Sequence, residues 1–414
     1  MIRSLIDTYI HQGYLPDCRM QLDKGITQGG SNAEVVIADW AVKMGLTSNI
    51  NWTRAYEGMV KDAEVEPSNW LVEGRGYLES YKEYGYIPND APQRGHGLRG
   101  AQISKTVEYA YDDYCIAEVA HMLNNTDGYK KYIGRAENWK NMMKLDQQSF
   151  LADGTDTGFT GFMQPRLRNG SWVLQEPSRG SPANWEDCCG MFSQDVATYE
   201  GSSWLYTTYA PGDGAQLVLM LGDDDEFVRR LDYMHENDLV DIGDEQAFLP
   251  VFQYHYAGRP GKSTCRSHFY IPRLFNSTLV GMPGNDDSGA MGAFVVFSML
   301  GIWPIAGQNV YLINAPFYPE ISIRSPVTGE TAKIVAHGWD VEYRNIYIQK
   351  AKLNGKTWTK SWLDHSFFLE GKTLELWLGP EEKLEESGWG TRDEDRPPSL
   401  STTGVYLDEL YHPM

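Results

Sequence analysis

Two adjacent carboxylates, Asp286 and Asp287, lie in the stretch Gly284–Gly289, between a turn and an apolar run. The run over 291–300 has apolar residues at roughly helical spacing, and Gly and Pro follow it as stop signals. Free backbone N–H groups and the positive end of the helix dipole favour an ionised carboxylate at such a helix N-terminus. An aspartate held there could act as a general base or bind a cation. The alternative is a helix-capping role for Asp287 or Ser288, which is the commonest reason for such a residue before a helix.

Glu200 lies among aromatic residues, because Tyr199, Trp204 and Tyr206 flank it in the sequence. A carboxyl group packed against aromatic rings loses hydration, so its pKa rises and it can carry a proton near neutral pH. A general acid needs this property. The alternative is a glutamate whose carboxyl lies in solvent beside core aromatics, and without a second carboxylate we would favour that interpretation.

A third candidate is the glycine-bearing loop Asp241–Gln246, which holds the adjacent carboxylates Asp244 and Glu245. Oxygen-rich loops of this kind can hold calcium. A turn followed by a helix cap explains the same residues equally well, so both interpretations stay open here. The acidic cluster over 223–226 lacks the ligand spacing of a calcium-binding hand, and we interpret it as a solvated helix start.

Glu108 and Asp112 form a fourth pair, four residues apart on a helix predicted from Gln102 to Leu123. At this spacing the two charges lie one above the other, which destabilises a bare helix by about 0.2–0.5 kcal/mol. Either solvent absorbs this cost, or a sugar or a cation lies between the carboxylates.

The elements that must position these residues form a helical part and then a β part. Helical patterns occur near 2–10, 35–44, 56–60, 102–123 and 128–150, and the Gly-rich segment 153–190 is expected to be a long loop with short strands. After Pro304 the period changes, and strands are predicted over 310–313, 320–323, 332–335, 346–349 and 374–378, with a hairpin turn at Asn354-Gly355. We therefore predict a helical domain over 1–305, an antiparallel β domain over 306–383 and a C-terminal tail over 384–414.

The chain has 414 residues and a net charge of −20, which argues against nucleic acids and anionic membranes as partners. No apolar run reaches about eighteen residues, so no membrane span is expected, and the start of the chain lacks the basic head and apolar stretch of a signal peptide. The five cysteines have no metal-binding or redox spacing. Four Asn-x-Ser/Thr sequons lean weakly toward a secreted glycoprotein, at Asn51, Asn124, Asn169 and Asn276.

Six motifs along the chain carry a resemblance to a known family. The chain resembles the exo-acting α-mannosidases of glycoside hydrolase family 92, and it is most similar to their fungal members. The order and spacing of the motifs agree as well as their sequences, which makes the resemblance specific. The motifs are Gly85–Pro88, Ser104–Asp113, Gly161–Met163, Tyr199–Gly201 with Trp204, Tyr256–Pro260 and Pro283–Gly289.

This resemblance implies a mainly α fold, with an (α/α)6-like toroid that is incomplete at its N-terminus and is followed by a small antiparallel β domain. It also implies calcium-dependent hydrolysis of terminal α-linked mannose from N-glycans or mannans, with inversion at the anomeric carbon. By position, Glu200 matches the family's general acid and Asp287 the proposed base, with Asp286 assisting. Asp244 and Glu245 match the segment near the family's calcium ion, which is thought to bind sugar hydroxyls and help distort the ring.

Further residues are expected to contact or support a glycan substrate, and the resemblance implies secretion. The expected contacts are Trp204, Asn285, Arg166, Glu108 and Asp112. An alternative from another functional class is a catalytically silent glycan-binding remnant of such an enzyme, which keeps the aromatics and carboxylates without a closed pocket.

The chain also departs from the family pattern. The large N-terminal β-sandwich domain and the first toroid segment of the family have no match here, so we expect an N-terminal domain to be missing. Many members have Asp-His where this chain has Ser31-Asn32, and a His where it has Gly212. The His-Glu pair associated with α-1,2 specificity has no match near Ile242, which leaves the linkage preference open.

Overall fold

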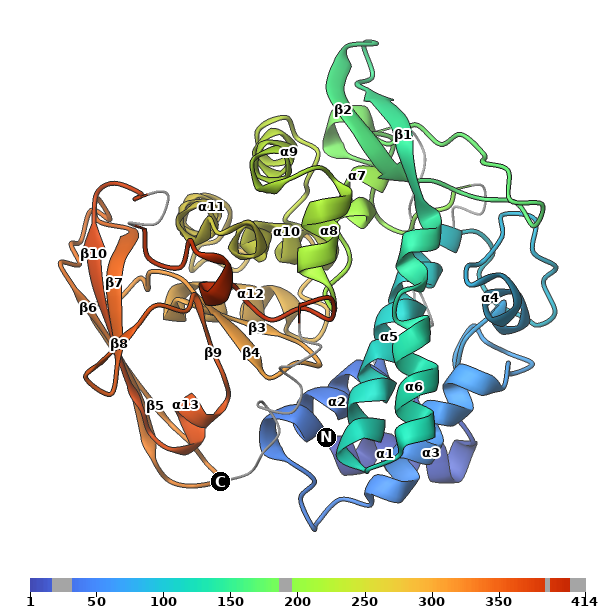
Figure 1. Ribbon diagram of the computed structural model, residues 1–414, viewed down its shortest axis with the longest axis horizontal. Helices are drawn as coiled ribbons and strands as arrows, with labels where there is room; N and C mark the ends of the chain where they lie inside the picture. Colours follow the sequence, from blue (N-terminus) through green and yellow to red (C-terminus); the bar gives the residue numbers. More distant parts are fainter. Residues whose placement is uncertain (17–31, 186–195, 384–387, 403–414) are drawn as a thin grey trace.

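The computed structural model describes residues 1–16, 32–185, 196–383 and 388–402. Figure 1 shows the N-terminal helices on one side, a β hairpin projecting beyond a central group of helices, and β sheets on the other side. Several positions named from the sequence lie outside the described residues: Ser31, Cys18, Cys188, Cys189 and the tail after 402.

The long helix α5 organises the N-terminal helices. It is buried on all sides because α2, α3 and α6 pack against it, and 18 of its 21 residues are buried. The helix predicted from Gln102 to Leu123 is therefore confirmed to within one residue. The helices of this group are α1 (Ile2–Gln12), α2 (Ala33–Met44), α3 (Trp52–Glu64), α4 (Leu78–Tyr84), α5 (Gln102–Met122) and α6 (Thr126–Arg135).

The helix predicted over 128–150 is wrong beyond Arg135. A short 3-10 helix, η1 (Asn138–Met142), leads into β1 (Met143–Phe150), which pairs antiparallel with β2 (Asp156–Met163). The segment Met-Lys-Leu-Asp-Gln-Gln holds good helix formers, so local propensity favours a helix there. Pairing with the β2 strand overrides that propensity, because strand preference depends mostly on the surroundings.

The central helices begin where the sequence supplies caps. Asp213 Oδ1 accepts the N–H of Gln216 at the start of α8 (3.4 Å), and Asp223 Oδ1 accepts the N–H of Glu226 at the start of α9 (2.9 Å), where the acidic cluster predicted a helix start. These elements are η2 (Pro182–Asn184), α7 (Ser203–Thr207), α8 (Gly214–Met220), α9 (Asp224–Glu236), η3 (Glu245–Ala247), α10 (Phe248–Phe252), η4 (Gln253–Ala257), α11 (Pro260–Leu274) and α12 (Ala290–Leu300).

Two sheets follow, a five-stranded sheet with the order β5-β6-β10-β7-β8 and a three-stranded sheet with the order β3-β4-β9. All five predicted strands are present, and Asn354 and Gly355 form the predicted turn with φ values of 48° and 76°. The elements are β3 (Ile302–Ile305), β4 (Val310–Ile313), β5 (Glu320–Arg324), β6 (Thr331–His337), β7 (Tyr347–Leu353), β8 (Lys356–Trp358), β9 (Trp362–Leu363), α13 (Ser366–Leu369), β10 (Thr373–Gly379) and η6 (Asp393–Asp395).

One strand pair departs from the predicted antiparallel arrangement. β10 pairs parallel with β6 and antiparallel with β7. The chain leaves this sheet after β8 to form β9 and α13, and it then returns to place β10 between β6 and β7. A wholly antiparallel prediction assumed neighbouring hairpins and could not foresee this insertion.

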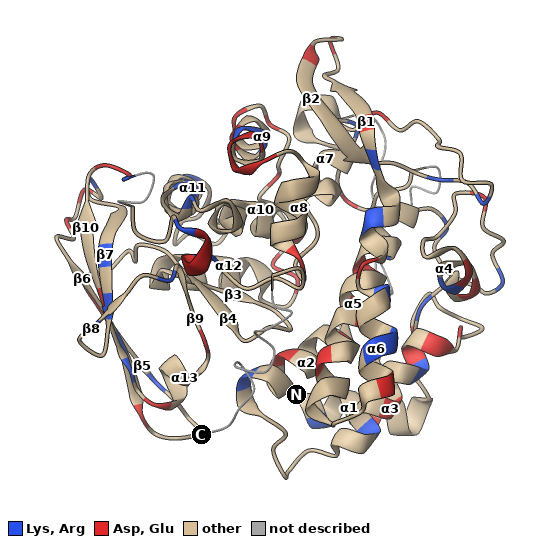
Figure 2. Ribbon diagram, in the orientation of Figure 1, with Lys and Arg blue, Asp and Glu red and all other residues tan. Residues whose placement is uncertain are grey.

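Residues 388–402 lie against the central helices. The N–H of Leu400 donates to the carbonyl oxygen of Gly212 (3.0 Å), and Arg396 pairs with Asp224 (2.6 Å). Figure 2 shows Lys and Arg interspersed with Asp and Glu along the ribbon. In the described part of the chain, no helix is both long enough and apolar enough to cross a bilayer.

Candidate active site

Glu200 follows a backbone segment that is fastened to two helices. The N–H of Tyr199 donates to Ser104 Oγ on α5 (2.8 Å), and the hydroxyl of Tyr206 on α7 donates to the carbonyl oxygen of Tyr199 (2.6 Å). Glu200 itself has a φ of 45°, in the left-handed region that side-chain-bearing residues rarely adopt. The surrounding contacts therefore hold Glu200 in a strained position, as is common at active sites.

In the loop before α12, Asp286 is the aspartate whose hydrogen bonds reach the first turn of the helix. The carbonyl oxygen of Asp286 accepts the N–H of Ala290 (2.7 Å), and its Oδ1 accepts the N–H of Gly292 (3.1 Å). Asp286 thus satisfies the first turn of the helix, a capping role that the sequence suggested for Asp287 or Ser288. Asp287 and Ser288 have φ values of 43° and 64°, so this loop is strained as well.

The second acidic loop lies against this one, backbone to backbone. A Cβ atom on Gly284 would lie 2.0 Å from the carbonyl oxygen of Gly243, and Gly284 has a φ of +60°. Only glycine permits both this approach and this conformation. The contact brings Asp244 and Glu245 next to the loop that carries Asp287.

The charges confirm that the three loops meet. Burial raises the pKa of Glu200, hydrogen bonds from Tyr199 and Gln246 lower it, and the charge of Asp287 raises it, with a net upward shift. Burial, together with the charges of Asp241, Glu200 and Asp287, raises the pKa of Asp244 to about 7.

Glu245 is the group most closely tied to Asp287. Burial raises its pKa to about 7, and both the charge of Asp287 and a hydrogen bond with that residue act in the same direction. Glu200, Asp244, Glu245 and Asp287 therefore form one cluster of carboxyl groups, drawn from three segments that are distant in the sequence. We call these four residues the carboxylate cluster.

The donor types in this cluster fit a hard cation such as calcium. Glu245 Oε1 and Gln246 Oε1 are buried and have no hydrogen-bond partner, and adjacent carboxyl groups with raised pKa values indicate an excess of negative charge. Calcium takes six to eight oxygen ligands, including amide oxygens and water. Within the described ranges, no three Asp, Glu, His or Cys side chains converge as a metal site. The side chains of this cluster would therefore supply only part of the oxygen ligands that such a cation takes.

Glu108 lies near the carboxylate cluster. The hydroxyl of Tyr209 donates to Glu108 Oε2 (3.1 Å), and burial raises the pKa of Glu108 to about 7. Burial also raises the pKa of the Tyr206 hydroxyl, and the charges of Glu108, Glu200 and Asp244 raise it further. These three carboxyl groups thus surround one tyrosine.

Asp112 does not face the carboxylate cluster. It is fully buried with Glu34 and Asp113 around the guanidinium of Arg75, at 3.7, 3.2 and 2.7 Å respectively. The sequence left open whether a cation lies beside Asp112. The structure has one there, the guanidinium of Arg75. The predicted substrate contact is corrected to a structural role, because a fully buried carboxylate has no surface for a sugar.

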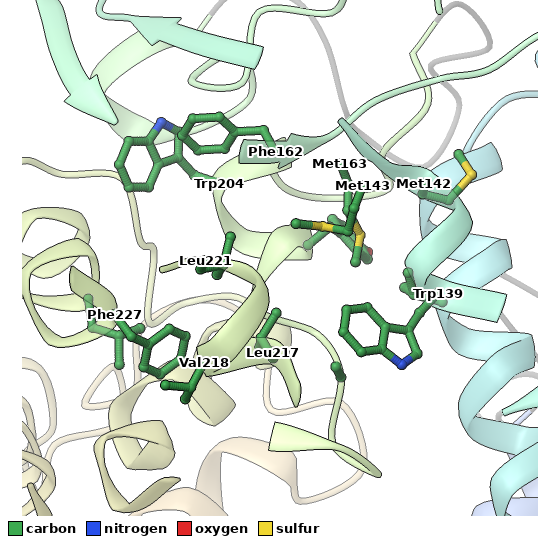
Figure 3. Packing of buried hydrophobic residues seen from close by; sticks show 14 of the residues in the cluster. Trp139, Met142, Met143, Phe162, Met163, Trp204, Leu217, Val218, Leu221 and Phe227 are labelled. Carbon is green, nitrogen blue, oxygen red and sulfur yellow. The ribbon is translucent and has the colours of Figure 1, made fainter. Parts of the chain in front are cut away.

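Trp204 is also corrected to a packing residue. Only 1% of it is exposed, and its Nε1 donates to Ser149 Oγ (2.9 Å). Figure 3 shows its ring against Phe162 in the hydrophobic core, and Phe159 packs on it edge to face. Both faces are therefore unavailable to a ligand.

The two remaining predicted contacts lie in different surroundings. Asn285 is exposed beside Asp286 in the loop before α12. Arg166 stacks between Tyr86 and Trp172, with its guanidinium carbon 5.1 and 5.0 Å from the ring centroids. Among the described residues, no hydrogen bond or ion pair joins Arg166 to the carboxylate cluster.

Sequence reasoning missed three residues of the site: Gln246, Tyr206 and Tyr209. Gln246 hydrogen-bonds Glu200, and the two tyrosines contact Tyr199 and Glu108. The position of Gln246 directly after Asp244-Glu245 was the available signal. The tyrosines gave none, since their role depends on how α5 and α7 pack.

With the geometry described, relatives can be compared. Residues 1–380 match a family model described as the glycosyl hydrolase family 92 catalytic domain. The chain belongs to glycoside hydrolase family 92. An uncharacterized secreted glycosidase of Arthroderma benhamiae is 51% identical to this family 92 chain over 407 residues, which cover 98% of the chain and 51% of that protein. The chain therefore spans about half the length of this curated relative.

Solved structures of family 92 share the fold. An α-mannosidase of Bacteroides thetaiotaomicron in complex with mannoimidazole has a TM-score of 0.77 and 24% identity, with 99% of this chain and 53% of that chain covered. An inverting mannosidase of the same organism has a TM-score of 0.78 and 24% identity, with 97% and 52% covered. At this identity the likeness shows the fold, which is a helical unit with a small, mostly antiparallel β unit.

Proposed function

We propose that this family 92 chain is a calcium-dependent exo-α-mannosidase that removes terminal α-linked mannose from N-glycans or mannans with inversion. The observation that carries the proposal is the carboxylate cluster, in which Glu200 and Asp287 both have left-handed backbone and the charge of Asp287 raises the pKa of Glu200. The structural relatives described as mannosidases support the sugar, and one is described as inverting. The relative described as secreted supports an extracellular location.

Glu200 is assigned as the general acid. Its raised pKa favours the protonated carboxyl, and the acid would transfer this proton to the glycosidic oxygen as the bond to the anomeric carbon breaks. Tyr199 and Gln246 hydrogen-bond the group and fix its direction.

Asp287 is assigned as the general base. It takes a proton from a water molecule that attacks the anomeric carbon on the face opposite the leaving group, which gives inversion. Asp286 holds the start of α12 and so positions Asp287. No direct hydrogen bond joins Glu200 to Asp287 in the described segments, and an inverting enzyme needs such a separation, since a water molecule must fit between the two groups.

Asp244, Glu245 and Gln246 would hold the calcium ion. When bound, calcium supplies electrostatic help at the sugar hydroxyls during the build-up of positive charge on the ring. The loop that holds these three residues also positions Asp287, because it packs directly on the loop that carries Asp287.

The test is release of mannose from α-linked mannobioses by the 414-residue chain, with and without a calcium chelator. We expect release that the chelator abolishes, and β-mannose as the first product by NMR. Glu200→Gln and Asp287→Asn should lower kcat by at least about 100-fold, as is typical for loss of a general acid or base, while the exposed control Glu137→Gln keeps it. A folded protein that binds mannobiose and releases nothing would instead establish the glycan-binding alternative.

A further inference from the structure

A second cavity lies between α8, β9 and the C-terminal segment, with a volume of about 380 Å³. None of the carboxylate cluster lines it. The volume is at the lower end of the range for small-molecule sites. This cavity is therefore separate from the proposed catalytic site, and its chemistry needs its own explanation.

Hydrogen bonds fix the C-terminal segment beside this cavity at the start of α8 and at the start of α9. The N–H of Ala215 donates to Ser399 Oγ (3.0 Å), and Ser401 N–H donates to Asp213 Oδ1 (3.1 Å). At the other side, Arg396 pairs with Asp224 through two hydrogen bonds of 3.0 and 2.6 Å. These contacts fasten the C-terminal segment to α8, so the cavity is preformed.

One part of the lining is apolar and partly aromatic. Val218 and Leu219 come from α8 and Pro398 comes from the C-terminal segment, while Tyr256 and Trp362 present only small parts of their side chains, since 3% and 5% of these residues are exposed. Leu219 is 66% exposed and forms the edge of this apolar part. This part of the lining suits a ring with an apolar face.

The other part is polar and carries an excess of negative charge. Asp224, Asp393 and Glu394 line it together with Lys360 and Arg396. Figure 2 shows the short helix η6 as a continuous stretch of acidic residues. Because Arg396 is already bound by Asp224 and by Asp393 (3.1 Å), it has no free fork for a carboxylate or phosphate. An anionic ligand is therefore disfavoured here.

We propose that this cavity binds an uncharged pyranose ring, as a second saccharide site for a unit of the glycan that is not hydrolysed. A pyranose has an apolar face for the rings and hydroxyls for the carboxylates and Lys360. That the ring belongs to a glycan substrate rests on the proposed function, whereas the uncharged, hydroxylated character of the ligand follows from the lining alone.

The test uses the 414-residue chain with Glu200→Gln, so that hydrolysis does not consume the ligand. Titration calorimetry with a linear mannotriose and with methyl α-mannoside should give two sites for each chain. Leu219→Trp fills the cavity from an exposed position, and Thr402→Trp does so from the C-terminal segment. Each should remove one site or weaken it by at least tenfold. Leu174→Trp is the matched control, because Leu174 is 74% exposed and lies outside the cavity.

Thermal unfolding checks that each variant is folded. Two sites that persist in both tryptophan variants, or binding at only one site in the parent, would overturn the proposal, and so would a cavity that binds phenol but neither sugar. If Glu200→Gln still hydrolyses mannobiose, the catalytic assignment fails, while a cavity site removed by Leu219→Trp stands. If Glu200→Gln loses hydrolysis and every variant binds sugar at only one site, the catalytic assignment stands and the second saccharide site is refuted.

Discussion

Replacing Gly284 by alanine should disconnect the two acidic loops while the rest of the fold persists. The new Cβ atom would lie 2.0 Å from the Gly243 carbonyl oxygen, and such an atom pair normally stays beyond 3.0 Å. The loops must therefore move apart by about 1 Å. Alanine at a φ of +60° adds backbone strain of about 1–2 kcal/mol.

This displacement acts on catalysis because Asp244 and Glu245 follow Gly243, and Asp287 follows Gly284. A misplacement of about 1 Å at a catalytic group can cost about 100-fold in rate. We therefore expect Gly284→Ala to lower kcat on an aryl α-mannoside by about 100-fold. The midpoint of thermal unfolding should fall by only a few degrees, since about 1–2 kcal/mol of strain is small for a chain of this size.

Gly289→Ala is the matched control. Gly289 lies in the same loop with a φ of +107°, but a Cβ atom there would meet nothing within 4 Å. It adds backbone strain without the collision, so its stability should fall while kcat falls far less than in Gly284→Ala. Wild-type kcat in Gly284→Ala, or an equal loss in both variants, would refute the idea that the backbone contact sets the site geometry.

Three further predictions concern the rest of the chain. Arg75→Met leaves three buried carboxylates without their cation, so urea unfolding should show a loss of about 3–5 kcal/mol, and a loss below 1 kcal/mol would contradict a buried network. Burial raises the pKa of Glu108 from 4.5 to about 7, so the folded state holds this proton up to a higher pH than the unfolded state does. The free energy of unfolding should therefore fall by at most about 3 kcal/mol as the pH rises from 4.5 to 7. Glu108→Gln should flatten this decline in unfolding curves measured across that range. Asn169 and Asn276 should carry N-glycans after secretion from a eukaryotic host, because both are exposed in turns where their side chains bond the sequon hydroxyl (2.6 Å each), whereas the sequon of Asn51 runs into α3; peptide mass spectrometry after enzymatic deglycosylation would decide between them.

Local signals predicted much of the secondary structure. The strands of the β unit, the long helix α5 and the helix start at the acidic cluster over 223–226 were all found from spacing and residue type. The two wrong predictions have a common cause. β1 forms a strand although its residues favour a helix, and β10 lies between β6 and β7, two strands that precede it in the sequence. Both depend on partners that are distant in the sequence, which a local pattern does not contain.

The candidate site shows the same division. Glu200, the adjacent pair Asp244 and Glu245, and Asp287 were found in three separate stretches of the sequence, the family resemblance implied that they share one site, and the structure brings them together. Trp204 carries a motif match but lies in the core, since a motif records which residues recur and not which way they face. Gln246 was passed over because an amide carries no charge signal.

The placement of the cluster explains how one site can hold an acid and a base. Each of its three segments leads into a helix or 3-10 helix: Glu200 precedes α7, Asp244 precedes η3 and Asp287 precedes α12. Unpaired N–H groups at such positions favour negative charge, so the chain can gather carboxylates there. Burial acts against that charge, and it acts on Glu200 while Asp287 remains exposed. The half-buried Glu200 is therefore the group whose surroundings favour its proton, which fits the proposed acid, while the exposed Asp287 is open to the water molecule that a base must activate.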